Sequence, residues 1–66
     1  MVDDELLTTA EVAQQYRINA ATLRYWRHAD QGPASFTLGR RVLYRRSEVQ
    51  RWIAVCEQAT RRGGVA

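Results

Sequence analysis

The chain contains no lysine and has a single residue each of cysteine, histidine, proline, phenylalanine and methionine. One cysteine, Cys56, excludes an internal disulfide and suits a reducing compartment. Two serines, no lysine and one histidine leave few ways to pair a nucleophile with a base. His28 and Cys56 stand alone, so no metal-ligand spacing exists, and no glycine-rich phosphate loop is present. We therefore expect a non-enzyme with no catalytic residues, no cofactor and no metal.

Long hydrophobic runs are also absent. Nothing approaches the ~20 apolar residues that a membrane span requires, and no secretory signal is present. We expect a cytoplasmic protein that has no membrane partner and is associated with the nucleoid when bound to DNA. The 66 residues, 45% hydrophobic and 26% charged, are typical of one small folded domain.

The charges are unevenly distributed along the chain. Net charge is +3, yet Asp3, Asp4 and Glu5 place three of the seven acids in the first five residues. All ten basic residues are arginines that lie beyond this acidic start. A basic body favours phosphate-bearing partners, and the planar arginine fork suits phosphate. The pattern predicts a flexible acidic leader over residues 1–5, a folded domain over 6–62 and a flexible tail over 63–66.

The first helix and the turn that follows it have clear sequence signals. Thr8 and Glu11 match a capping box, so we expect a helix over residues 9–16 that buries Val12, Ala13 and Tyr16. After a short turn, Asn19 is a good N-cap for a second helix that runs to about residue 29. Two short helices joined by so tight a turn predict a helix-turn-helix, whose second helix enters the DNA major groove.

The second helix has two different faces. Leu23 and Trp26 point toward the core, and the opposite face carries small and polar residues that can approach DNA. Two of these residues have an alternative to contacting DNA. His28 could be exposed without a role, and Tyr25 could pack under the hairpin that follows. The residues that we predict to contact DNA from this helix are Ala21, Thr22, Arg24, Tyr25 and His28.

Residues 36–44 predict a β-hairpin, here called the wing. Phe36 and Leu38 alternate with Thr37, Val42 and Tyr44 alternate with Leu43, and Gly39 supplies a tight turn. Four of the seven residues in RRVLYRR, 40–46, are arginine. Such a cluster either keeps a small protein soluble or contacts DNA, and its place beside a capped second helix favours DNA. The predicted contacts to the minor groove and the DNA backbone are Arg40, Arg41, Arg45, Arg46 and Arg27.

The last helix is predicted to begin at Ser47, which forms a second capping box with Gln50. A core stripe follows at helical spacing, at Val49, Trp52, Ile53 and Cys56. The helix ends near residues 60–62, before Gly63 and Gly64. Trp26 and Trp52 could stack on bases, but their positions on core-facing stripes favour packing. The fold class is therefore mainly α: a winged helix-turn-helix of three helices and a two-stranded wing.

These segments resemble the winged-helix domain of the MerR superfamily, most closely its small excisionase (Xis-like) and AlpA-like branch. The resemblance is carried by LLTTAEVAQQYRINAATLRYWR, GP and LGRRVLYRRSEVQRW, and its most specific parts are TLRYW and the two arginine pairs of the wing. It implies that Arg24 and Tyr25 face the groove and that Arg40 and Arg41 lie at the wing tip. Members of this branch bend attachment-site DNA and bias an integrase toward excision, or act as small transcriptional regulators.

The expected partners are double-stranded DNA, neighbouring copies of the protein on that DNA and, as a candidate, an integrase. No long dimerisation helix follows Cys56, so we expect a monomer in free solution. The leading hypothesis is an excisionase-type architectural factor. A small MerR-like or AlpA-like regulator and a module that docks an acidic protein are the alternatives.

Overall fold

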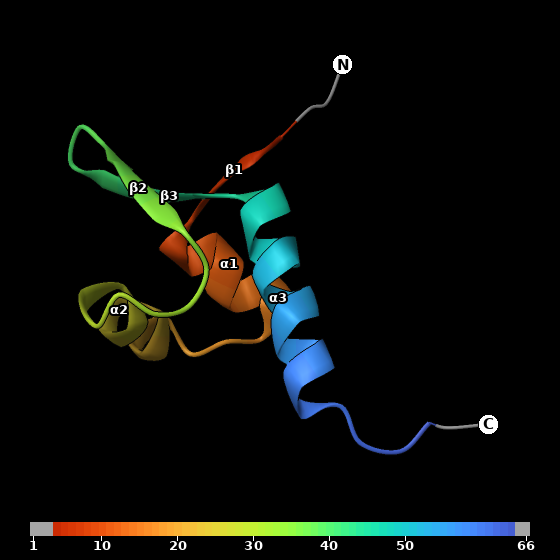
Figure 1. The fold of residues 1–66 in the computed structure, drawn as a ribbon. Coiled ribbons are helices and arrows are strands. Elements are labelled where there is room, and N and C mark those ends of the chain that lie inside the picture. The colour runs from red at the N-terminus through yellow and green to blue at the C-terminus, as the bar shows by residue number, and fades with distance from the viewer. Residues whose placement is uncertain (1–3, 65–66) are drawn as a thin grey trace.

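A computed structural model describes residues 4–64 of the chain, which form three helices and a small sheet (Figure 1). The sequence predicts this mainly helical class, and the structure confirms it. No helix within the described residues is long and apolar enough to span a bilayer. The elements are, in chain order, β1 (Leu6–Thr8), α1 (Thr9–Tyr16), α2 (Ala20–His28), β2 (Ser35–Leu38), β3 (Arg41–Arg45) and α3 (Arg46–Thr60).

The sheet has three strands rather than the predicted two. β3 lies in the centre, with β2 and β1 antiparallel on either side of it. β1 pairs Leu7 with Tyr44, and both side chains are almost completely buried. The apolar pair explains the extra strand: pairing β1 with β3 satisfies its backbone while it places Leu7 in the core.

The helix-turn-helix is built by local capping, as the sequence predicts. The Thr8 hydroxyl accepts from the Glu11 backbone N–H at 3.1 Å, and the Glu11 carboxylate accepts from the Thr8 N–H at 2.8 Å. Arg17 ends α1 in the left-handed conformation, with φ of 58°. Asn19 then caps α2, because its Oδ1 accepts from the Ala21 N–H at 2.8 Å.

The wing has a two-residue turn at Gly39 and Arg40, with a φ of 65° at Gly39. Leu38 therefore pairs with Arg41, and Phe36 pairs with Leu43. Because paired residues share a face, Phe36 and Leu38 lie on the outer face, away from inward-pointing Tyr44. The outer face is consequently apolar at several positions, which the alternation within each strand did not reveal. Its side chains range from exposed Leu38 to nearly buried Leu43.

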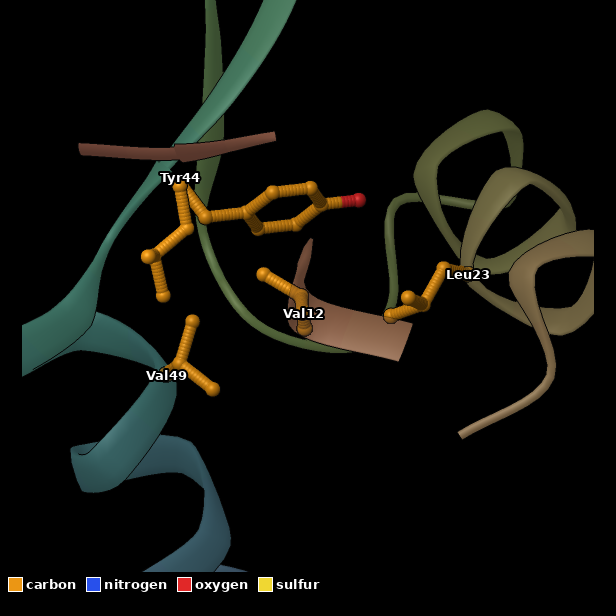
Figure 2. Close-up of a cluster of buried hydrophobic side chains, with 5 residues drawn as sticks. Val12, Leu23, Tyr44 and Val49 are labelled. Carbon is orange, nitrogen blue, oxygen red and sulfur yellow. The ribbon is translucent and has the colours of Figure 1, made fainter. Parts of the chain in front are cut away.

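The core takes one buried side chain from each of β1, α1, α2, β3 and α3. Its buried members are Leu7, Val12, Leu23, Tyr44 and Val49, and the four that are labelled point toward one another in Figure 2. The two tryptophans pack together at its edge, with ring centroids 5.1 Å apart and an interplanar angle of 56°. The predicted stripe of α3 faces inward, but only Val49 is fully buried; Trp52, Ile53 and Cys56 are half-buried.

The start of α3 differs from the prediction. The helix begins at Arg46, and Ser47 lies inside its first turn instead of capping it. The cap comes from the other end of the sequence. The Asp4 carboxylate accepts from the Ser47 backbone N–H at 3.1 Å and from its Oγ at 2.8 Å, and the Glu5 carbonyl accepts from the Arg46 N–H at 2.9 Å. Remote residues thus satisfy amides that a helix leaves unpaired at its N-terminus.

Asp4 and Glu5 therefore belong to the folded domain, contrary to the predicted flexible leader, whose residues 1–3 lie outside the described residues. The Glu5 carboxylate accepts from the Arg46 guanidinium at 2.6 Å, and the Tyr16 hydroxyl accepts from it at 3.3 Å. The hydrogen bonds from Ser47, first its backbone N–H and then its hydroxyl, lower the pKa of Asp4.

Of the predicted tail, Gly63 and Gly64 follow α3 without regular structure, and residues 65–66 lie outside the described range.

We expect Asp4→Ala to lower the melting temperature by several degrees, because it removes the acceptors at the start of α3. A carboxyl whose pKa is lowered in the folded state stabilises the fold above its unfolded pKa, and loses that effect as pH falls. Thermal melts between pH 2 and 7 should show Asp4→Asn losing less stability than the native chain below about pH 4. Asp30→Asn removes an exposed carboxylate that makes no ion pair among the described residues, so it is the control; an equal effect would contradict the capping role.

We expect Gly32→Ala to destabilise the fold by about 2–4 kcal/mol, as backbone strain and overpacking add together. Gly32 has a φ of +77°, and an added Cβ would lie 3.0 Å from Cε3 of Trp26. Gly39→Ala is the matched control, because its φ of +65° brings similar strain but nothing lies within 4 Å. Urea unfolding should therefore show the smaller loss, about 1–2 kcal/mol, for Gly39→Ala. Equal losses would show that contact with Trp26 is unimportant.

Candidate nucleic-acid interface

The outer face of α2 is exposed and does not contribute to the packing of the core. Ala21, Arg24, Tyr25 and His28 are all exposed, and within residues 4–64 the last three side chains make no hydrogen bond or ion pair. Tyr25 is 65% exposed, so it does not pack under the wing. Predicted Thr22 is half-buried at the edge of this face. These side chains are available to a partner.

The inward side of α2 sets the direction of that face. Leu23 is 1% exposed, and Trp26 packs against the core and against Trp52 of α3. Residues three apart on a helix share a side, so burying Leu23 and Trp26 turns Arg24 and Tyr25 outward. Packing on the core, rather than any polar contact, orients the exposed face.

The four wing arginines are in different environments. Arg40 lies in the turn and Arg41 begins β3; both are exposed and have no acidic partner among the described residues. The side chain of Arg45 is 52% exposed, lies 3.8 Å from the Asp4 carboxylate and sits 5.6 Å from the centre of the Phe36 ring. Arg46 has a structural role that the sequence did not reveal, because its guanidinium binds Glu5 and Tyr16. The arginines at the tip are therefore the most available to phosphate.

Arg27, predicted to contact the DNA backbone, lies near the end of α2 and not on the wing. It is exposed and lines a hollow of about 360 Å³ that includes Asp30, Gln31, Gly32, Pro33 and Ser35. The hollow lies between α2 and the start of β2, because these residues connect the two elements. Arg27 can therefore reach a phosphate beside α2 rather than beside the wing tip.

The two candidate contact elements lie on the same side of the molecule. In Figure 1, α2 and the tip of the wing project away from the body, and α3 lies on the opposite side. The two elements that carry Arg24 and Arg40 thus lie on one side of the molecule. A second helix and an arginine-bearing hairpin on one side are the elements with which a winged helix-turn-helix meets adjacent DNA grooves.

One exposed residue of this side has no place in the predicted interface. Leu38, the last residue of β2, is 59% exposed beside the wing turn. Its position could have been recognised from the turn length, since a two-residue turn pairs it with Arg41 on the outer face.

Fold and exposed residues together define a DNA-binding winged helix-turn-helix domain. The chain belongs to a family described as "Helix-turn-helix domain", whose model matches residues 6–55, more than half of the chain. This match covers every element up to and including most of α3. Comparisons with curated proteins and with solved structures found no match. The protein is thus a helix-turn-helix protein that binds double-stranded DNA.

We expect Arg24→Ala to cost roughly 1–3 kcal/mol on a specific site and to relax the preference at one or two base pairs. Arg45→Ala should instead weaken binding to specific and unrelated duplexes by the same factor, because phosphate contacts carry no sequence information. Fluorescence anisotropy with a selected duplex and a scrambled duplex measures both effects. Arg51→Ala is the control, because Arg51 pairs with Glu48 on α3, 3.5 Å away. Arg24→Ala acting equally on the two duplexes would refute its assignment to base reading.

Proposed function

We propose that the protein is a sequence-specific architectural factor of the excisionase type, which bends attachment-site DNA and biases an integrase toward excision. It belongs to the MerR-like branch in this proposal and acts by binding rather than by catalysis. One observation carries the proposal: α2 and the tip of the wing lie on one side of the molecule (Figure 1), and both elements carry exposed arginines without an acidic partner among the described residues.

The distribution of ion pairs supports DNA as the partner. Arg46 and Arg51 are held by Glu5 and Glu48, at the side away from the wing tip. Arg24, Arg27, Arg40 and Arg41 have no acidic partner among residues 4–64, and Arg45 is only loosely paired. The other exposed arginines without an ion pair in this range are Arg17, after α1, and Arg61 and Arg62, after α3. Unpaired arginines at the contact elements would concentrate positive charge where phosphates approach. Because unpaired arginines are present on both elements with which a winged helix-turn-helix reads DNA, DNA is favoured over an acidic protein as the partner.

The small size of the contact surface favours binding by several copies, which together can bend the DNA. One reading helix and one wing cover a short stretch of duplex, so one copy recognises few base pairs. Several copies on adjacent, similarly oriented sites would supply specificity together. Bending 20–30 base pairs costs on the order of 1–6 kcal/mol, which several bound copies can offset more readily than one. The curved complex would bring integrase-bound arms together.

We expect cooperative binding and bent DNA on a fragment that carries tandem copies of a selected site. Circularly permuted fragments in native gels measure the bend, and the steepness of the binding curve measures cooperativity. A fragment with one copy of the site is the control, and it should bend less and bind without cooperativity.

A salt series on the same duplexes separates the possible failures. About five neutralised phosphates give a slope of log K against log salt near −4 to −5. Salt-dependent, selective binding by single copies without a bend would overturn the architectural role and leave a simple transcriptional regulator. A slope near zero would refute DNA binding by these arginines and favour the protein-docking alternative.

A further inference from the structure

The tip of the wing carries an exposed apolar side chain beside its arginines. Leu38 precedes the turn at Gly39 and Arg40, and its cross-strand partner is Arg41. It is 59% exposed and lies on the outer face of the sheet, away from the buried core. An exposed leucine is common on protein surfaces, but this one occupies the projecting end of an arginine-rich hairpin.

Packing within the protein does not explain Leu38. Phe36, two residues earlier on the same face, lies opposite nearly buried Leu43 and under the Arg45 guanidinium. Leu38 has only Arg41 opposite it, at the last pair before the turn. Phe36 is 36% exposed and Leu38 is 59% exposed, so the exposure of the outer face increases toward the turn. The leucine is placed where a partner of the wing would meet it.

The flanking charge and the shape of the tip indicate which partner that is. Arg40 and Arg41 are exposed beside Leu38 and have no acidic partner among the described residues. A narrow DNA minor groove, about 6 Å wide, concentrates negative potential that attracts arginine. Minor-groove proteins often insert an apolar wedge such as leucine between base pairs and so kink the duplex.

We propose that Leu38 is such a wedge: the wing enters the minor groove, Arg40 and Arg41 face the phosphates, and the Leu38 side chain inserts between two base pairs. This inference rests on the proposed function and supplies the place where each copy bends the DNA. Pyrimidine–purine steps unstack most easily, so Leu38 favours such a step at a fixed distance from the bases that α2 reads. The wing thereby contributes sequence preference without a hydrogen bond to a base.

The test uses the full chain and a duplex selected for binding to it, with 2-aminopurine placed at successive positions. The fluorescence of this base rises when its stack opens. The native chain should raise it at one step on the wing side of the site. Leu38→Ala should remove most of that rise and reduce the bend measured by energy transfer between the duplex ends, while affinity falls by no more than about tenfold. Leu38→Phe should preserve the rise, because phenylalanine is also a wedge.

Two variants are matched controls for the loss of an exposed apolar side chain. Leu6→Ala alters the same outer face but on β1, far along the sheet from the turn, and Leu6 is 40% exposed. Val55→Ala alters α3, where Val55 is 62% exposed. Both should leave the 2-aminopurine signal and the bend unchanged.

Other outcomes overturn the proposal. A native chain that binds and bends the duplex but opens no step would refute the wedge and leave the proposed function standing. The same holds if Leu38→Ala binds with an unchanged signal. If Leu38→Ala and Leu6→Ala both reduce cooperativity on tandem sites and neither changes the single-site signal, the outer face contacts another copy instead. A native chain that binds no duplex would overturn both proposals.

Discussion

The capping of α3 by residues 4 and 5 is the interaction on which the arrangement of the sheet and the last helix depends. The Asp4 carboxylate and the Glu5 carbonyl accept hydrogen bonds from the first turn of α3. The next residues form β1, which pairs with β3, and β3 runs directly into α3. The strand pairing and the cap therefore hold β1, β3 and the start of α3 against one another. Leu7, Tyr44 and Val49, one from each of these elements, belong to the buried core.

The same contacts organise the charge of the protein. Glu5 binds Arg46, and Asp4 lies near Arg45, so the base of the wing is largely neutralised. Arg40 and Arg41 at the other end have no such partner among residues 4–64. Within the wing, positive charge without a partner is thereby greatest at the tip. An arginine that has already bound a carboxylate must give up that bond to contact a phosphate, whereas an exposed unpaired one need not.

The helix-turn-helix is held by a different set of contacts, which are mostly apolar. Leu23 is buried in the core, and Trp26 packs against Trp52 and lies close to the backbone of Gly32. The positive φ of Gly32 allows the loop after α2 to turn back over the tryptophan. Since these contacts are all on one side of α2, its opposite side is left free for binding. Stability and recognition are thus assigned to different faces of one short helix.

The sequence by itself determined the features that depend on neighbouring residues. The capping box at Thr8, the Asn19 cap, the extent of α1 and the inward positions of Leu23 and Trp26 follow from local spacing, and the structure confirms them. Only the tertiary structure decided the third strand, the cap of α3 and the structural role of Arg46. Each of these joins residues about forty positions apart. The sequence also allowed a different arrangement for the residues involved: a solvated leader that includes Asp4, a helix capped by Ser47, and an Arg46 that binds a DNA phosphate. Local spacing cannot rank such alternatives, because residues 4 and 5 come close to residues 46 and 47 only once β1 has paired with β3.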